Sequence, residues 1–575
     1  MKKIIFYFFF ALFYSCSSKQ QVDLIVFNAI VYTVDSSFST AQCFAINEGK
    51  FIAIGTNDEI QNKYEAKEII DAKEKAVYPG FIDSHCHFFG YGEGLQTVNL
   101  VGTKSFEEVI QRVIEYSKKN KSEWIIGRGW DQNDWTVKEY PTRYELEKLF
   151  PNTPVFLERI DGHAAIANGC ALKKAKISIH TKISGGQIDF ALITKEEGEK
   201  YNWLKFEAGG ESKPINYPLF IPSGILIDNA VDLIKKEIPK PSKESIKNAL
   251  LAAQTNCFAL GITTVDDAGL EKIIIDNINE LQNKGELKMR VYAMLSDNKE
   301  NLDHYLKAGP FKTERLNVRS FKFYADGSLG SRGACLLHPY SDKTEQQGFL
   351  LNTPGHFDSA AALLYSKGFQ MNTHCIGDSA SRLISEIYLK NLISKSIAGP
   401  APLSFRWRIE HAQVINAADL KFYSAIIPSV QPTHATSDMY WAEERLGKER
   451  LQYAYAYNDL LKAAGMIALG TDFPVENINP LFTFYAAVAR KDINGYPAIG
   501  FQLKNALSRE NTLRGMTIWG AYANFEEKEK GSIEIGKFAD FVILENDIMK
   551  CKINKVPNTK VVYTFVNGER VYSNN

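Results

Sequence analysis

The sequence predicts an α/β protein built around a (β/α)8 barrel, and three observations support this fold class. The middle of the chain alternates short β-forming runs with longer helical stretches, a pattern typical of parallel strands joined by helices. Eight of these runs have the length of a strand. Several of them end in histidine or aspartate, and the carboxyl ends of barrel strands form the active-site face of this fold.

The eight strand candidates fall in one central region, and we expect residues 79–530 to form the barrel domain. In chain order the candidates occupy residues 76–87, 261–269, 287–295, 318–327, 369–378, 406–414, 426–434 and 466–476. The first two are separated by far more chain than one helix needs. Residues 90–244 are therefore predicted to form a cap insertion over the barrel mouth.

Both chain ends carry short β-rich runs broken by Asn, Asp and Gly, as in small antiparallel sheets. The segment VNGER at residues 566–570 places Asn-Gly between β-formers, which indicates a hairpin. We expect residues 20–78 and 531–575 to form one small β-sandwich domain, with the barrel inserted between its two parts.

The N-terminal segment has two lysines, a short apolar core and then Ser15-Cys16-Ser17, the layout of a secretory signal. Its core is too short to span a membrane comfortably. Residues 1–16 are predicted to be a lipoprotein-type signal peptide, so that lipid on Cys16 anchors an exported protein at the bacterial cell envelope. An ordinary signal peptide cut nearby, or a simple N-terminal anchor, stays open because Phe13 and Tyr14 fit the lipoprotein cleavage box poorly.

The overall charge excludes one class of partner. The 575 residues include 67 Lys+Arg and 67 Asp+Glu, so no net charge attracts nucleic acid or an anionic membrane. We expect a small-molecule substrate, no nucleic acid, and membrane contact through the lipid anchor only; a homo-oligomer stays open. The eight cysteines lack paired spacing, which argues against a disulfide framework.

The first strand candidate ends in FIDSHCH, which holds two histidines two residues apart. In a strand such residues share a face, so His85 and His87 point the same way and Cys86 points the other way. Two neutral imidazoles converging from one strand suit a divalent metal ion. A pair of buried, hydrogen-bonded histidines is the alternative, and this short motif alone does not decide between them.

Three further strand candidates, the fifth, sixth and eighth, end in potential metal ligands. These are His374, His411 and Asp472. Each taken singly is more often a satisfied core or cap residue than a ligand. Because the ends of barrel strands converge in space, their joint placement favours a metal site.

The fourth strand candidate carries a lysine on the face that should point inward. Ser320, Lys322, Tyr324 and Asp326 share one face by the strand period. A lone ammonium inside a barrel is costly, and burial favours the neutral amine. A neutral amine can capture carbon dioxide as a carbamate that bridges two metal ions. An ion pair of Lys322 with Asp326 or Asp378 is the competing interpretation.

This ordered set of residues resembles the amidohydrolase superfamily, whose fold is a TIM-like barrel with a split β domain. More narrowly, GWDQ, DGHAAIAN, KFYADGSLGSRGA, HCIGD, RIEHAQ, QPTHATSD and GTDFPVE are similar to amidohydrolase family 3, a branch that includes the N-substituted formamide deformylases. The resemblance implies one or two divalent metal ions. Zinc fits imidazole and carboxylate ligands best, while manganese, iron and nickel stay open.

The resemblance also implies roles for individual residues. His85, His87 and Asp472 would hold the more buried ion. His374 and His411 would hold the second, with a carboxylated Lys322 as bridge. Substrate contacts would include Asp131, His163 and His434, and also Asp326, which opens a Gly-rich loop able to approach the substrate closely. Ordinary loop structure is the alternative for Asp131, His163 and His434.

Such a site predicts hydrolysis of a non-peptide C–N bond, in an amide or an N-formyl or N-acyl amine. A metal ion lowers the pKa of a water molecule and polarises the carbonyl, while Asp472 takes the proton and later passes it to the leaving nitrogen. Histidine ligands must be neutral, so acid should inactivate the site. The same fold and metal used for isomerisation or for C–O or lactone hydrolysis is an alternative, and a non-catalytic binding lipoprotein is a less favoured one.

Two groups of residues carry weaker expectations. Aromatic residues near the expected mouth hint at an apolar or aromatic substrate group, although such residues are also common core fillers: Trp130, Trp135, Trp441 and Phe473. The remaining histidines and two cysteines are expected to be structural or surface residues: Cys86, Cys375, His180, His304, His338 and His356.

Overall fold

The computed structural model describes residues 19–120, 122–196, 218–394 and 404–574. The predicted signal peptide and Cys16 lie outside the described residues. Every cysteine in the described part is free, as the spacing of the cysteines predicts. Within the same part, no helix has the length and apolar character needed to cross a membrane.

Eight parallel strands form a nearly closed barrel, so the predicted barrel is confirmed. Neighbours around the sheet follow chain order from β8 to β22, with a short antiparallel β17 (Phe311–Lys312) added beside β18. The bounds are β8 (Phe81–Cys86), β15 (Ile262–Leu270), β16 (Arg290–Ser296), β18 (Leu316–Tyr324), β19 (Gln370–Cys375), β20 (Arg408–His411), β21 (Ile427–Val430) and β22 (Ala468–Leu469).

The first strand candidate divides into two strands at Gly80. Residues before it form β7 (Ala76–Pro79), which belongs to a chain-end sheet, and residues after it form β8. The backbone changes partners here, because Gly80 N–H donates to Asp540 O and Phe81 N–H donates to Gly261 O. A Cβ at Gly80 would lie 2.3 Å from the Thr263 hydroxyl oxygen, so only glycine fits this crossing.

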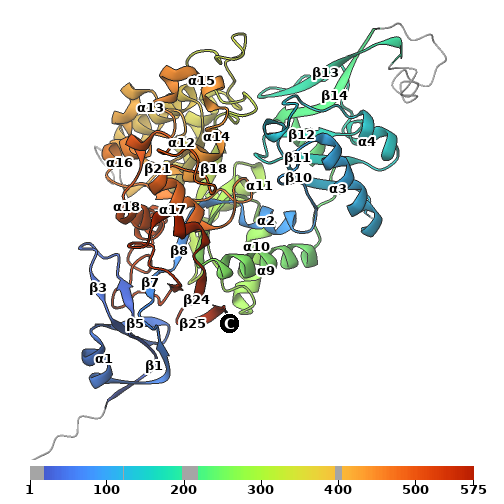
Figure 1. Ribbon diagram of the computed structural model, residues 1–575. Coiled ribbons are helices and arrows are strands. Elements are labelled where there is room, and N and C mark those ends of the chain that lie inside the picture. Colours follow the sequence, from blue (N-terminus) through green and yellow to red (C-terminus); the bar gives the residue numbers. More distant parts are fainter. Residues whose placement is uncertain (1–18, 121, 197–217, 395–403, 575) are drawn as a thin grey trace, which may run out of the picture.

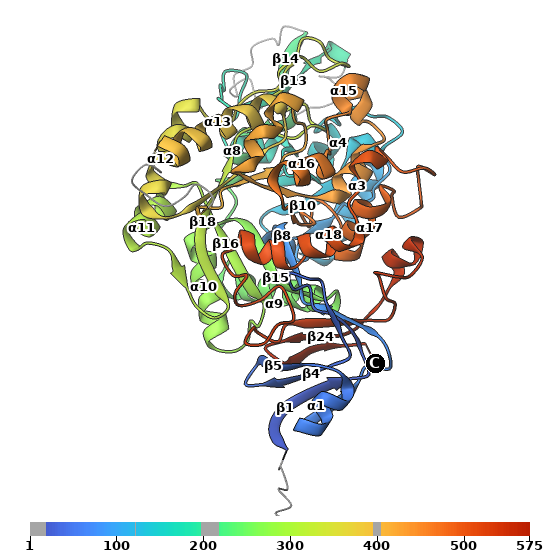
Figure 2. The same ribbon diagram turned by 90° about the vertical axis from the view of Figure 1, so that its left-hand side faces the viewer.

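Helices surround the barrel and cover the outward faces of its strands (Figures 1 and 2). In chain order they are α9 (Lys243–Ala259), α10 (Lys272–Asn283), α11 (Lys299–Ala308), α12 (Pro354–Lys367), α13 (Asp378–Ser394), α14 (Pro432–Asp438), α15 (Ala442–Leu451), α16 (Tyr457–Ala464), α17 (Pro480–Ala489), α18 (Arg509–Gly515) and α19 (Ile518–Ala523). Ser242 begins α9 by accepting a hydrogen bond from Ser245 N–H, a typical N-cap.

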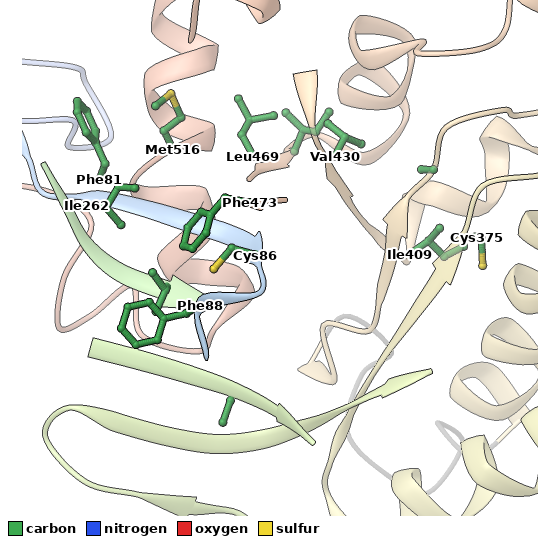
Figure 3. Packing of buried hydrophobic residues seen from close by; sticks show 14 of the residues in the cluster. Phe81, Cys86, Phe88, Ile262, Cys375, Ile409, Val430, Leu469, Phe473 and Met516 are labelled. Atoms are coloured by element: carbon green, nitrogen blue, oxygen red, sulfur yellow. The ribbon is translucent and has the colours of Figure 1, made fainter. Parts of the chain in front are cut away.

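The outward strand faces and these helices share one large hydrophobic core. Figure 3 shows Cys86 beside Phe88 and Phe473, and Cys375 beside Ile409. Both cysteines therefore point away from the face that carries the histidines, as the strand period predicts.

The insertion between β8 and β15 contains its own mixed sheet (Figure 1). The strand order is β13-β14-β12-β11-β10-β9, with hydrophobic clusters that include helix residues on its two faces. Its elements are α2 (Phe88–Gly94), β9 (Val98–Asn99), α3 (Phe106–Lys119), β10 (Ile125–Trp130), α4 (Tyr144–Leu149), β11 (Val155–Arg159), β12 (Ala164–Ala167), α5 (Gly169–Lys174), β13 (Gly186–Ile193), β14 (Leu219–Asp228) and α8 (Val231–Lys235).

The two chain ends meet in a pair of sheets below the barrel (Figure 1). One sheet has the order β5-β4-β1-β6, and the other has the order β25-β24-β23-β7-β2-β3. One hydrophobic cluster joins residues of both sheets, including Phe44, Phe51 and Phe541. The elements are β1 (Gln20–Phe27), β2 (Ile30–Tyr32), β3 (Thr40–Ala41), β4 (Cys43–Asn47), β5 (Lys50–Gly55), α1 (Asn57–Lys63), β6 (Tyr64–Asp71), β23 (Phe541–Leu544), β24 (Val561–Val566) and β25 (Glu569–Ser573).

Candidate metal centre

The end of β8 and the loop after β22 bring three predicted ligands together. Asp472 Oδ1 lies 3.2 Å from His87 Nε2 and 3.7 Å from His85 Nε2. The His85 side chain is fully buried, whereas a quarter of the His87 side chain is exposed. Barrel closure fixes this approach, because Asp472 N–H donates to His85 O across the last gap between strands, at 2.8 Å.

The hydrogen bonds made by Nδ1 of His85 and of His87 determine which nitrogen of each ring is protonated. The other nitrogen, Nε2, faces Asp472. His87 Nδ1 lies 3.0 Å from Ala268 O, which can only accept, so Nδ1 carries the proton and Nε2 carries a lone pair. His85 Nδ1 lies 2.5 Å from Glu410 Oε2, with the same consequence. Asp472 Oδ1 is buried and accepts no hydrogen bond within the described chain.

Two imidazole lone pairs and a carboxylate oxygen therefore converge, and none of these three groups supplies a proton to the others. Acceptors that face one another at such distances repel unless a cation lies among them. Neutral imidazole nitrogen and carboxylate oxygen are common ligands of zinc and related divalent ions. The residues present thus fit a divalent metal ion held by His85, His87 and Asp472.

The charge states of these groups agree with this donor set. Burial lowers the pKa of His85 to about 4, with nearby Lys322 acting in the same direction. Burial also lowers the pKa of His87. Burial alone would raise the pKa of Asp472, but the hydrogen bond from the His434 imidazole holds it well below its usual range. At neutral pH the two HxH imidazoles are neutral and the carboxylate is ionised.

A second group of donor atoms surrounds the other oxygen of Asp472. Ligand atoms of His411, His434 and Asp472 lie within 4.8 Å of one another. His434 Nε2 is 3.2 Å from Asp472 Oδ2, and its Nδ1 is 3.0 Å from Glu476 Oε1. Burial alone would lower the pKa of His434, but these two carboxylates hold it well above its usual value. His434 is thus a hydrogen-bond donor to Asp472, and its charge disfavours metal binding.

His374 lies beside this group. Its ring centroid is 4.5 Å from that of His411, and its Nε2 is 3.5 Å from Gly327 O. His411 Nδ1 in turn lies 2.8 Å from Gln431 Oε1. Burial holds the pKa of both histidines well below the usual value, so both are neutral. The two rings lie in contact, while their assignment to a second metal ion stays a prediction.

Lys322 points into the barrel, as its strand period predicts. It is 1% exposed, and its Nζ lies 3.2 Å from His85 Nε2 and 4.7 Å from the centre of the Tyr324 ring. Burial lowers its pKa to about 8. Among the described residues, no carboxylate forms an ion pair with Lys322.

Asp326 has other partners. Its carboxylate accepts hydrogen bonds from the backbone N–H groups of Cys335, Ile376 and Gly377 at 2.8 to 3.0 Å. These contacts fix the loops after β18 and β19. Among the described residues Asp326 forms no ion pair with Lys322, and its expected substrate contact stays a prediction. Asp378 likewise accepts from Leu337 N–H.

The insertion reaches the candidate metal centre through His163. The His163 ring centroid is 5.0 Å from that of His374, and Nδ1 lies 2.7 Å from Asp228 Oδ1. Asp131, the other insertion residue expected to contact substrate, forms an ion pair with buried Arg159 at 2.5 Å. The insertion therefore places an imidazole beside the candidate metal ligands, and the substrate contact expected of Asp131 stays a prediction.

The Gly-rich loop after β18 packs against the insertion. A Cβ at Gly327 or Gly333 would lie 2.6 or 2.5 Å from a carboxylate oxygen of Asp228. Ser328 Oγ donates to Asp161 Oδ2 at 2.6 Å. The glycines of this loop thus allow its backbone to lie close to Asp228 of the insertion.

Sequence reasoning missed several residues that orient the ligands. Glu410 contacts His85, Asp83 accepts hydrogen bonds from Thr471, and Asp228 contacts His163. The period-2 argument that selects Lys322 also puts Arg408 and Glu410 on one face of the run RWRIEH, and could have found that pair.

The aromatic residues noted near the mouth are buried in hydrophobic clusters: Trp130, Trp135, Trp441 and Phe473.

Comparison with known proteins decides the family. The amidohydrolase family profile matches residues 68–192 and 220–572. The chain belongs to the amidohydrolase family. The resemblance drawn from the sequence motifs is therefore confirmed, and the protein is a member of a family of metal-dependent hydrolases.

Individual relatives match nearly the whole chain. Protein LONG AFTER FAR-RED 3 of Arabidopsis thaliana is 30% identical over 570 residues, covering 96% of this chain and 91% of its own. The N-substituted formamide deformylase of Arthrobacter pascens is 23% identical, covering 96% and 98%. A solved structure, an uncharacterized metal-dependent hydrolase from Pyrococcus horikoshii OT3, superposes with a TM-score of 0.71 at 28% identity, covering 92% and 99%.

Proposed function

We propose that this amidohydrolase hydrolyses a non-peptide C–N bond, in an amide or an N-formyl or N-acyl amine. The observation that carries the proposal is the convergence of the His85 and His87 lone pairs on Asp472 Oδ1 at the barrel mouth. The formamide deformylase among its relatives supports the choice of bond. Zinc is the proposed metal, because imidazole and carboxylate ligands suit it best.

The proposed chemistry divides between the metal ion and the chain. His85, His87 and Asp472 would hold a divalent ion, which would lower the pKa of a water molecule and polarise the substrate carbonyl. Asp472, ionised and buried, accepts a proton from the attacking water and later delivers it to the leaving nitrogen. His434 donates to Asp472 Oδ2 and keeps the carboxylate turned toward the centre. One water is consumed, and a carboxylic acid and an amine leave.

The insertion acts in this proposal as a cap. His163 contacts the His374 ring at the mouth and is held by Asp228, while Asp161 accepts a hydrogen bond from Ser328 in the loop after β18. Residues that exclude bulk water strengthen every electrostatic interaction inside a site. The substrate would therefore bind between the barrel mouth and the insertion.

The test is to assay zinc-loaded protein side by side on 4-nitroformanilide, 4-nitroacetanilide and a γ-lactone. Release of 4-nitroaniline, abolished by a chelator and restored by Zn²⁺, is the expected result. Turnover of the lactone alone would favour C–O hydrolysis. Absence of stoichiometric metal after gentle purification would favour the alternative hypothesis of a non-catalytic binding lipoprotein.

We also propose that Lys322 is carboxylated and bridges two ions. Its buried amine, lowered pKa and lack of an ion-pair partner among the described residues support this. Metal reconstitution with bicarbonate should then bind more metal than reconstitution without it, and Lys322→Ala should reduce metal occupancy. One ion beside a bare ammonium in electron density would contradict the bridge and leave the His85, His87 and Asp472 site intact.

Export as a lipoprotein is a further proposal, motivated by Ser15-Cys16 after the apolar run. Protein from its native host should partition into detergent, and Cys16→Ser should yield an uncleaved or soluble form. A soluble wild type with a mature N-terminus elsewhere would refute it.

A further inference from the structure

Glu410 lies behind His85, on the side of the ring opposite the candidate metal site. Its carboxylate is fully buried, with Oε2 2.5 Å from His85 Nδ1. The next residue, His411, has a φ of +70°, so the chain turns there and both side chains face the barrel interior. His85 is thus held between Glu410 on one nitrogen and the ligand face on the other.

Arg408 holds Glu410 in turn. Arg408 Nε forms an ion pair with Glu410 Oε1 at 2.7 Å, and Nη1 donates to Asp266 Oδ2 at 2.9 Å. Nη2 donates to Ser84 O, the carbonyl directly before His85. Asp266, Arg408, Glu410 and the neutral His85 imidazole form a connected polar network whose side chains are all fully buried. Buried charges are costly unless paired, and each member here has a partner.

Two other imidazoles at the centre have uncharged partners behind them. His87 Nδ1 faces a backbone carbonyl, and His411 Nδ1 faces the amide oxygen of Gln431. Of the two imidazoles that face Asp472 Oδ1, His85 is the one with a carboxylate behind it. A carboxylate behind a ligating imidazole fixes its tautomer and increases the basicity of the nitrogen that binds metal.

We propose that Glu410, fixed by Arg408, is a positioning residue that holds His85 with Nδ1 protonated and Nε2 aimed at the site, and thereby sets the affinity of this centre for a divalent cation. The inference rests on the proposed function in one respect, namely that a metal ion binds here. It adds a determinant of affinity that does not itself touch the ion.

The first test is competition for Zn²⁺ between the protein and a chromophoric chelator. Glu410→Gln keeps the shape and an acceptor oxygen but removes the charge, and affinity should fall by roughly 10- to 100-fold. Asp540→Asn is the matched control, because it removes a carboxylate from another buried pair, with Arg290 at 2.6 Å, that touches no histidine. That control should lose stability and keep the wild-type affinity. Equal affinities for wild type and Glu410→Gln would overturn the inference.

Two further measurements keep the inference testable if Glu410→Gln folds poorly. In zinc-loaded wild type labelled with ¹⁵N-histidine, two-bond ¹H–¹⁵N spectra should show His85 protonated at Nδ1; protonation at Nε2 would overturn the inference. The visible spectrum of bound Co²⁺ should change in Arg408→Lys and not in Asp540→Asn. Wild type that binds no Zn²⁺ would defeat the proposed function together with this inference, whereas unaltered affinity in Glu410→Gln defeats this inference alone.

Discussion

Asp472 and His411 occupy backbone conformations that few non-glycine residues adopt, with φ of +63° and +70°. Such backbone conformations cost free energy and persist only where several surrounding contacts hold them. They are found most often at functional sites. Here the bond from Asp472 N–H to His85 O and that from Val475 N–H to Asp472 O hold the loop. The conformation turns the carboxylate toward three imidazoles at once.

Asp472→Asn tests the role of this carboxylate in proton transfer. The amide fills the same space and keeps one oxygen for the metal, so the fold and much of the bound metal should remain. Turnover should drop by at least about a hundredfold, the usual contribution of a general base. Kinetics on the active probe, with metal analysis of the same samples, provide the measurement. Near-normal turnover would remove Asp472 from the mechanism.

The buried histidines should each reduce the folding stability of the metal-free protein in mild acid. The pKa of His85 falls from 6.5 in the unfolded chain to about 4 in the fold, and His374 and His411 shift in the same direction. Between these values the unfolded chain binds more protons than the folded one, so stability falls as pH falls. Buried carboxyls with raised pKa, Asp83 and Asp267 among them, act in the opposite direction over the same range. The test therefore compares metal-free wild type with His85→Gln: from about pH 6.5 toward pH 4 the wild type should lose more in melting temperature than the variant. Equal losses in the two proteins would contradict the assignment of a neutral buried His85.

At the scale of elements, the closure of the barrel depends on a very short last strand. β22 has two residues, and the contact to β8 is completed by backbone and side-chain bonds rather than by a long ladder. Thr471 donates from both its N–H and its hydroxyl to the Asp83 carboxylate. Gly470 lies so close to β8 that an added Cβ would sit 2.5 Å from His85 N and 2.7 Å from His85 O.

Gly470→Ala should therefore force β22 away from β8 and move Asp472 relative to His85. Overpacking of this kind typically costs about 1–3 kcal/mol, and zinc affinity should fall with it. Chemical denaturation and zinc titration give the two readouts. Gly94→Ala, where a Cβ meets nothing within 4 Å, is the matched control and should change neither. Wild-type zinc affinity in Gly470→Ala would show that the strand contact does not set the ligand geometry.

At the scale of the whole molecule, the two ends of the chain depend on each other. β23, from the C-terminal part, pairs with β7, from the N-terminal part, in the interior of one six-stranded sheet. β7 leads directly into β8, which carries His85 and His87. The chain-end sheets therefore support the strand that begins the candidate metal centre.

Truncation after Lys530 should consequently abolish folding of the barrel as well as of the chain-end sheets. It removes β23 to β25 and exposes an unpaired, apolar edge at β7, which favours aggregation. Soluble yield and circular dichroism measure the outcome. Removal of residues 574 and 575 alone is the control and should be harmless. A soluble, zinc-binding product from the long truncation would show that the barrel folds independently of the sheet.

The parts that the sequence predicts well are those governed by local pattern. Eight apolar runs with polar ends predict eight barrel strands, and each run overlaps the strand found there. The strand period also predicts correctly that Cys86 and Cys375 face the core and that Lys322 faces inward. Alternation along a strand depends only on backbone geometry, so it can be predicted without knowing what packs on either face.

The sequence by itself determined the barrel and brought His85, His87 and Asp472 to one place, because barrel strand ends must converge. Only the tertiary structure decided what lies behind and between those residues. The division of the first strand at Gly80 depends on Asp540, about 460 positions away in the chain, and Glu410 meets His85 across 325 positions. The partners of Asp326 are backbone groups that become available only when two loops meet. Such contacts depend on distance and angle between segments far apart in sequence, and no local pattern encodes them.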